Sequence, residues 1–329
     1  MVQRNASCPC NSGKRFKHCC GSLGAKSSTV EISDEQLLAV LKKVDDEHVE
    51  GGLQPGAREI MNVGKALQEF GIQAILIGPE YMVPDISRRA QRINRTLFIP
   101  KELEVGGLHL GAFLFRDMFC QLYAPITFGT CYIDFWKMLD LSDVQKAWLA
   151  DDPEQSARFV DQSMDIMDFG YGWSEFGHGR KINVRSKDLI WRAHSQLEAS
   201  AATAIAGCDY SGTIQSALLG TELALKAGLA AHGMTDKELA KRTLGHDLTA
   251  LTVELAKFET DLDHERVGRV VEKFPDFVES RYNLPTPGRI ETGHILMGAQ
   301  YVASEVTRQF SDRNGRKDDS SFPPRKYPA

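Results

Sequence analysis

Residues 209–233 read DYSGTIQSALLGTELALKAGLAAHG, and this stretch decides the fold. Its apolar residues recur at helical spacing over most of the circumference, which predicts a buried central helix with neighbours on several sides. Its small residues let those neighbours approach closely, and Gly233 supplies the left-handed position that ends a helix. Only Glu222 and Lys226 interrupt the apolar surface. They stand four residues apart in the order that favours an ion pair.

Helical patterns continue on both sides of this stretch. A segment beginning near Ser186 precedes it, and further apolar patterns follow at 248–258, 267–274 and 295–310, which predicts a bundle of about five helices. Upstream, a capping box at Ser33 starts another helix.

Three further patterns stand upstream of the bundle. Residues 108–167 are expected to form three or four helices with aromatic cores. Two short apolar runs, 72–78 and 96–100, fit a β-hairpin and buried helical fragments equally well.

Composition limits the classes of function. The chain has 329 residues, 42% of them hydrophobic, with a formal net charge of -5 and a pI near 6.0. This balance argues against a broad surface for nucleic acid, although a local basic site remains open. No apolar run reaches the length of a membrane span, and the polar start lacks the apolar core of a secretion signal. We therefore expect a cytoplasmic protein with no membrane partner.

Four cysteines stand within thirteen residues, at Cys8, Cys10, Cys19 and Cys20. So short a segment cannot bury an apolar core, whereas zinc bound by four thiolates supplies folding energy directly. Disulfides are the rival interpretation, but a reducing cytoplasm disfavours them and adjacent cysteines would pair only with strain. Four protein ligands leave no open coordination position, so the predicted Zn²⁺ is structural. The other cysteines, Cys120, Cys131 and Cys208, stand among apolar residues and are expected to be buried thiols.

The cysteine spacing closely resembles the SEC-C motif, found at the end of the SecA translocase motor. The Asn-Ser-Gly turn, the basic residues and Phe16 between the cysteine pairs also fit it. The resemblance assigns the metal to the four cysteines and leaves His18 as a neighbour. It implies docking on a protein or on the ribosome. The alternative is that the metal only stabilises the fold of this segment.

The C-terminal half is similar to the HEPN superfamily of helical bundles. The matching stretches, in chain order within residues 186–311, are Glu222–Lys226, Gly245–Leu248 and Ser280–Tyr282. The resemblance implies a homodimer that binds RNA or nucleotide, and many such domains serve in toxin–antitoxin or anti-phage defence systems. Some HEPN domains are metal-independent endoribonucleases with an Arg, four to six residues, then His. Arg289 and His294 form one such pair.

The chemistry of this pair follows from its residue types. His294 would exchange the proton of the 2′-hydroxyl or of the leaving oxygen, and Arg289 would stabilise the developing phosphorane charge. Ile290 departs from the pattern, because active members commonly carry a polar residue after the Arg. The alternative function is that of a non-catalytic adaptor, in which the bundle and the knuckle only bind partners.

Weaker candidate sites stand elsewhere. Arg88, Arg92 and Arg95 share one helical face, which suits a phosphate-contacting ridge or, more simply, a solvated surface. The aromatic residues of a glycine-rich loop at 169–179 have the types to line a pocket, which His178 and Arg180 would face. Separately, His246 and Asp247 are expected to cap a helix and pack. Arg281 and Tyr282 are predicted to be structural, with Arg281 paired with Glu222 and a phosphate contact as the alternative.

The sequence therefore predicts a mainly α protein. Its segments are a SEC-C zinc knuckle at 1–22, a linker at 23–33, a mostly helical domain of unassigned role at 34–180, a HEPN-like helical bundle at 181–312 and a disordered tail at 313–329.

Overall fold

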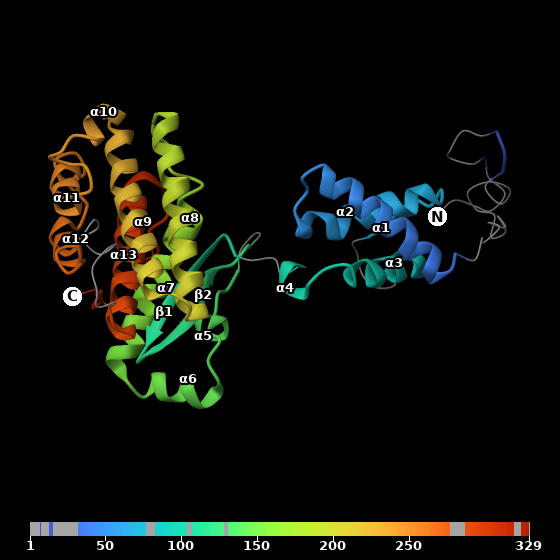
Figure 1. The fold of residues 1–329 in the computed structure, drawn as a ribbon, viewed down its shortest axis with the longest axis horizontal. Coiled ribbons are helices and arrows are strands. Elements are labelled where there is room, and N and C mark those ends of the chain that lie inside the picture. Colours follow the sequence, from blue (N-terminus) through green and yellow to red (C-terminus); the bar gives the residue numbers. More distant parts are fainter. Residues whose placement is uncertain are drawn as a thin grey trace. The chain divides into compact units, whose positions relative to one another are not determined.

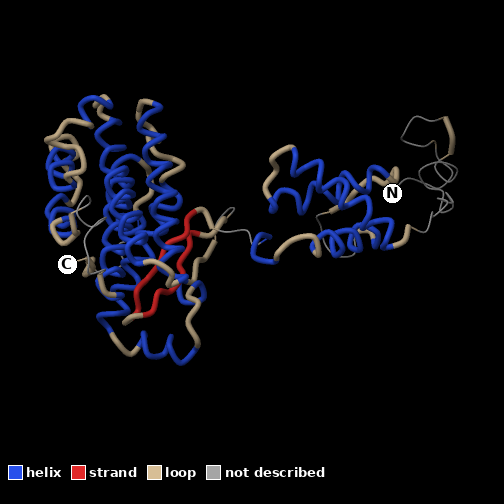
Figure 2. Tube along the Cα trace, in the orientation of Figure 1, coloured by secondary structure: helices blue, strands red, loops and turns tan. Residues whose placement is uncertain are grey.

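The chain divides into two compact units, Met1–Val105 and Gly106–Ala329 (Figure 1). The structure is a computed structural model. It describes residues 7, 13–15, 32–76, 83–103, 107–127, 131–276, 287–318 and 324–328. The expected mainly helical architecture with a short hairpin is confirmed (Figure 2).

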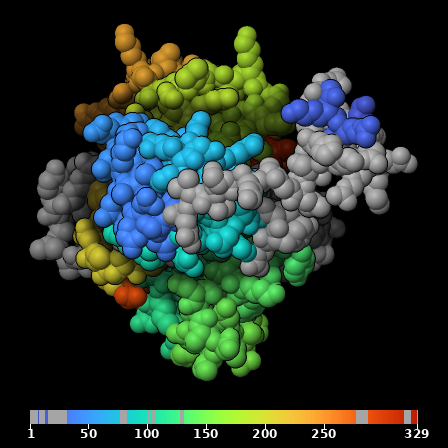
Figure 3. All heavy atoms as spheres, turned by 90° about the vertical axis from the view of Figure 1, so that its right-hand side faces the viewer, coloured from blue at the N-terminus to red at the C-terminus, as the bar shows by residue number. Residues whose placement is uncertain are grey.

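The first unit is built from helices. They are α1 (Asp34–Glu50), α2 (Pro55–Glu69), α3 (Asp85–Arg95) and the short α4 (Pro100–Leu103). Ser33 forms the predicted capping box, accepting from the backbone nitrogen of Gln36. Apolar side chains of α1, α2 and α3 pack into a core of their own. Figure 3 shows outer atoms of these helices in blue and cyan. Of the two short apolar runs expected to form a β-hairpin or buried helical fragments, residues 72–76 have no regular structure and residues 96–99 form turns.

The β-hairpin lies in the second unit instead. Strand β1 (His109–Phe115) pairs antiparallel with β2 (Met118–Ala124), and Phe113 lies opposite Cys120. The expectation of helices throughout 108–167 is therefore wrong for this segment. Both faces of β1 are buried, so its apolar residues form a continuous run without the alternation that marks a half-buried strand.

Helices make up the rest of the second unit. They are α5 (Phe135–Met138), α6 (Asp143–Ala150), α7 (Pro153–Gly172), α8 (Val184–Ala206), α9 (Tyr210–Ala231), α10 (Asp236–Leu239), α11 (Leu248–Ala256), α12 (His264–Val271), α13 (Arg289–Phe310) and α14 (Gly315–Asp318). Helix α9 is the predicted central helix and packs against α8, α11 and α13 (Figure 1). Its small residues act as expected, because a Cβ on Gly220 would lie 2.8 Å from the Leu197 side chain.

The division between the units falls near residue 105 and not at 180. Residues 169–172 complete α7, and Phe169 and Phe176 are buried in the same core as the apolar residues of α9. The indole nitrogen of Trp173 also donates to the carbonyl oxygen of Leu108, at 3.3 Å. The glycine-rich segment therefore joins two parts of one unit.

The C-terminal tail packs against α7, which corrects the expected disorder at 313–329 for its described residues. Arg325 and Arg316 pair with the buried carboxylates of Asp165 and Asp161 respectively. The backbone nitrogen of Tyr327 donates to Asp161 at 2.8 Å. The polar composition of the tail concealed these contacts because their partners stand about 160 residues earlier.

Other expectations hold only in part. Phe113, Phe115 and Phe119 are buried as predicted, whereas Tyr132 and Trp148 are exposed. Cys120 is buried, and burial raises the pKa of its thiol to about 12. Cys131 and Cys208 are exposed, contrary to expectation. Among the described helices, none combines the length and the apolarity needed to cross a bilayer.

Candidate functional site

A cavity of about 930 Å³ opens at the start of α13, and both members of the predicted pair line it. Arg289 is the first residue of α13, and His294 lies five residues later on the same helix. The other lining side chains come from the turn of the β-hairpin, α7, α12 and the residues just after it, α13 itself and the tail, namely Asp117, Arg158, Val270, Lys273, Phe274, Ile290, Glu291, Ile295, Tyr327 and Pro328. Segments far apart in the sequence therefore form one site.

Arg289 is held in place by three contacts. Its Nε donates to the carbonyl oxygen of Asp117 in the hairpin turn, and its Nη1 donates to the Tyr210 hydroxyl at 2.8 Å. The guanidinium carbon lies 5.0 Å from the ring centre of Phe119. These contacts fix the position of a positive charge at the wall of the cavity.

His294 is half-buried beside the tail. Its Nδ1 lies 3.2 Å from the Tyr327 hydroxyl. Burial lowers the pKa of His294, and the positive charges of Arg158 and Lys273 lower it further. The imidazole is therefore neutral at neutral pH, which is the form that accepts a proton.

Positive charge predominates among the lining side chains. Arg158, Lys273 and Arg289 carry three positive charges, against two negative charges on Asp117 and Glu291. Arg158 pairs with Glu154 at 3.1 Å, and its guanidinium carbon lies 5.0 Å from the Tyr327 ring centre. The lining thus carries a small excess of positive charge within a protein of net negative charge.

Sequence reasoning missed Arg158, Lys273 and Tyr327 as site residues. They stand on α7, just after α12 and in the tail, and only the fold brings them to α13. No local motif marks them, and Tyr327 belongs to a segment whose composition indicated disorder.

The ion pair predicted on α9 is present and buried. Lys226 Nζ lies 2.6 Å from Glu222 Oε1, and His246 Nδ1 lies 2.9 Å from Glu222 Oε2. Glu222 thus joins α9 to the segment before α11. The predicted pairing of Glu222 with Arg281 falls on residues 277–286, which lie outside the described part, as does the expected role of Tyr282.

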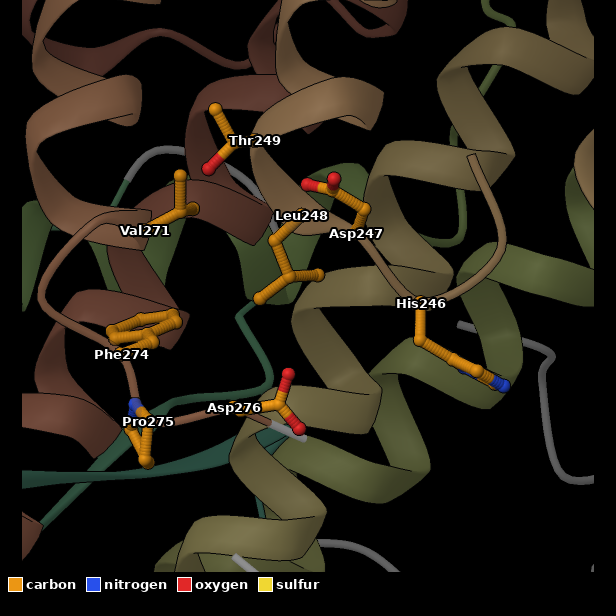
Figure 4. A pocket seen from close by; sticks show the side chains of 8 residues that line it. All are labelled: His246, Asp247, Leu248, Thr249, Val271, Phe274, Pro275 and Asp276. Carbon is orange, nitrogen blue, oxygen red and sulfur yellow. The ribbon is translucent and has the colours of Figure 1, made fainter. Parts of the chain in front are cut away.

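A smaller hollow of about 360 Å³ lies where α11 begins. Figure 4 shows Asp247 and Asp276 on opposite sides of it, and the His246 ring pointing away. Asp247 caps α11 by accepting from the backbone nitrogen of Ala250 at 2.9 Å, as predicted. Both predicted residues therefore have structural partners.

The remaining basic candidates also have partners or an ordinary surface position. Arg180 pairs with Glu259, and both line a hollow of about 470 Å³ together with His178. On α3, Arg95 pairs with Glu59 at 2.6 Å and Arg88 with Asp85 at 3.5 Å. These contacts favour the interpretation of the α3 arginines as a solvated surface.

The predicted zinc ligands Cys8, Cys10, Cys19 and Cys20 lie outside the described residues. Within the segment, Ser7 and Arg15 form an isolated antiparallel bridge, and Gly13 between them has a φ of 70°. The backbone at Ser7 thus runs antiparallel to that at Arg15.

The comparisons with known proteins bear on this segment. Residues 4–22 match the SEC-C motif. The match supports the N-terminal part of the sequence interpretation and a metal-binding segment there. No curated protein and no solved structure matches the chain. The similarity of the C-terminal half to the HEPN superfamily stays a prediction.

Proposed function

We propose that the protein binds RNA in the cavity at the start of α13 and cleaves it with His294 and Arg289. The observation that carries the proposal is the meeting of Arg289, His294, Arg158 and Lys273 at one cavity of about 930 Å³. The positive side chains of Arg158, Lys273 and Arg289 attract the negative phosphates of RNA. A base of the RNA can also pack against the apolar side chains of the lining.

The cleavage step uses the neutral form of His294. In the tautomer whose Nδ1 donates to the Tyr327 hydroxyl, Nε2 carries the lone pair and takes the proton of the 2′-hydroxyl. The 2′-oxygen then bonds to phosphorus, the bond to the 5′-oxygen breaks, and a water molecule gives that oxygen a proton as it leaves. Arg289 stabilises the negative charge of the phosphorane. Its contacts with Asp117, Tyr210 and Phe119 fix the guanidinium in position before the reaction. No metal takes part in this step.

A second copy of the chain and the N-terminal motif complete the proposal. The resemblance to HEPN domains brings two copies together at this end of α13, and exposed Ile290 offers them an apolar contact. Within the cytoplasm, the SEC-C segment binds a structural Zn²⁺ through its four cysteines and docks on a protein or on the ribosome. Such a protein would serve defence against phage or a toxin–antitoxin system.

Incubation of the purified protein with single-stranded RNA in chelator tests the proposal. We expect cleavage, and we expect His294→Gln to slow it by about hundredfold because the proton acceptor is lost. His264→Gln is the matched control, since His264 is exposed at the start of α12 and lies outside the cavity lining. Cleavage that persists at the wild-type rate in His294→Gln would show that the site is wrong.

Binding is measured separately from cleavage. Lys273→Gln is expected to weaken RNA binding and to reduce the slope of log affinity against log salt by about 0.7, the value for one lost phosphate contact. Lys237→Gln, an exposed lysine on α10, should change neither quantity. RNA that is neither retained nor cut by the wild-type protein would instead favour the adaptor function.

The pH dependence of cleavage has a defined sign. Because burial, Arg158 and Lys273 lower the pKa of His294, the acid limb of cleavage should lie below the pKa of about 6.5 of an ordinary histidine. Lys273→Gln removes one positive neighbour, so the acid limb should move to higher pH. A limb that does not move in a pH–rate profile of this variant would contradict the role of His294 as the base.

A further inference from the structure

A cluster of two histidines and one glutamate lies in the second unit, among residues to which the proposed function gives no role. His109 begins β1, and His194 and Glu198 stand one turn apart on α8. One ligand atom from each of the three residues lies within 4.8 Å of the other two. The residues are brought together by the packing of the hairpin on α8, and no sequence motif marks them.

His109 is the unusual member. Its side chain is only 1% exposed, yet neither ring nitrogen has a hydrogen-bond partner in the described part of the chain. Leaving a buried polar group unsatisfied costs roughly 1–3 kcal/mol, so an arrangement of this kind requires an explanation. Burial, followed by the charge of His194, holds the pKa of His109 well below its usual range. Its ring is therefore neutral and has a lone pair to donate.

The other two residues face His109 without satisfying it. Glu198 Oε1 lies 4.0 Å from His109 Nδ1 and 3.5 Å from His194 Nε2. His194 Nε2 also lies 3.0 Å from the carbonyl oxygen of Leu108, and its Nδ1 has no partner among the described residues. If the His194 proton moved to Nδ1, the lone pair of Nε2 would be directed at the cluster. The carbonyl oxygen of Leu108 would then be a further possible metal ligand.

The surroundings resemble the second layer of a metal centre. The backbone nitrogen of Leu110 donates to Glu198 Oε1 at 2.9 Å and so holds the carboxylate. The His194 ring lies against Trp173, with 4.4 Å between ring centres, and His109 meets the Phe169 ring edge to face. Glu198, whose side chain is 34% exposed, leaves an entry path from solvent.

We propose that His109, His194 and Glu198 bind a divalent transition-metal ion of the zinc class. Two imidazole nitrogens and one carboxylate oxygen are a donor set that Zn²⁺ accepts. Ligand atoms around tetrahedral zinc lie roughly 3.4 Å apart, so the ion would draw this cluster together by about an ångström. Bound there, the ion fastens the start of β1 to α8.

Zinc content per full-length chain tests the proposal, measured after equilibration with micromolar Zn²⁺ and removal of the excess. We expect His194→Gln and Glu198→Gln each to lower the content by one ion per chain, with an affinity loss of about hundredfold. His264→Gln should keep the wild-type content. Because the cysteine site is unchanged in all three variants, the difference counts only the proposed site.

Two further readouts do not depend on the cysteine site. Added Zn²⁺ should raise the melting temperature of the wild-type second unit and not that of Glu198→Gln, which keeps an oxygen to accept from Leu110. Cobalt bound at this site should add a d–d band that is absent from Glu198→Gln, while the sulfur-to-cobalt band of the cysteine site is the same in both proteins. Equal metal content in all variants, with no Zn²⁺-dependent melting shift and no added d–d band, would overturn the proposal and leave a buried water as the occupant.

Discussion

Replacing Arg308 by methionine is expected to lower the free energy of unfolding of the second unit by about 3–5 kcal/mol. The Arg308 side chain is 4% exposed and lies 2.7 Å from Asp165, 2.8 Å from Asp168 and 3.0 Å from Glu305. Burial opposes its charge, but the three carboxylates outweigh burial and raise its pKa well above the usual range. Methionine matches much of the volume and leaves buried carboxylates without their shared cation.

Denaturant unfolding followed by tryptophan fluorescence measures this effect. All four tryptophans stand between residues 136 and 191, so the signal reports on the second unit. Arg313→Met is the matched control, because the Arg313 side chain is 42% exposed and its pair with Glu175 is worth less than about 1 kcal/mol. If both variants lose the same free energy of unfolding, the ion pairs of Arg308 are not the buried, strongly stabilising network described above.

Gly170→Ala is expected to destabilise the same unit by about 3 kcal/mol. Gly170 lies on α7, where an added Cβ would stand 2.3 Å from the Cβ of Ala124 and 3.1 Å from that of His109. Both contacted atoms are Cβ atoms, whose positions are fixed by the backbone of the hairpin. The backbone of α7 or of the hairpin must therefore shift, and this cost exceeds the gain of about 1 kcal/mol from the helix propensity of alanine.

Gly268→Ala is expected to raise the free energy of unfolding, and it serves as the control for Gly170→Ala. Gly268 lies inside α12, and a Cβ there would meet no atom within 4 Å. Alanine should stabilise this helix by up to about 1 kcal/mol. If both variants stabilise the unit in the same unfolding experiment, the close packing of α7 on the hairpin is refuted.

Local sequence patterns predicted the helices well. The central helix was expected within 209–233, and α9 spans Tyr210–Ala231 with Glu222 and Lys226 paired as their spacing indicated. Capping residues such as Ser33 and Asp247 were identified because a cap acts within three residues of its helix. These features depend on interactions between near neighbours in the chain.

Features that depend on distant contacts were missed. The β-hairpin was read as helix because strand β1 is buried on both faces and shows no alternation. The tail was read as disordered because its polar residues find their partners, Asp161 and Asp165, only in the folded unit. The boundary expected near 180 came from glycine content, whereas the folded segment packs Phe169 and Phe176 into the core.

The same distinction applies to the candidate site. Arg289 and His294 were predicted from spacing on one helix, and the structure brings both to one cavity. Lys273 and Tyr327 reach this cavity from other segments, and the neutral state of His294 depends on burial and on positive charges that only the fold brings near. Spacing along one helix therefore predicts the pair, whereas the electrostatics of the cavity follow only from the fold.

Photochemical crosslinking of bound RNA tests the central claim most directly. Single-stranded RNA carrying 4-thiouridine is bound to the full-length protein and irradiated, and the modified peptides are identified by mass spectrometry. The account predicts crosslinks in peptides that contain Lys273 and Phe274 or His294, all of which line the cavity. Crosslinks confined to the Met1–Val105 unit, or to α8 and α11, would contradict an RNA site at the start of α13.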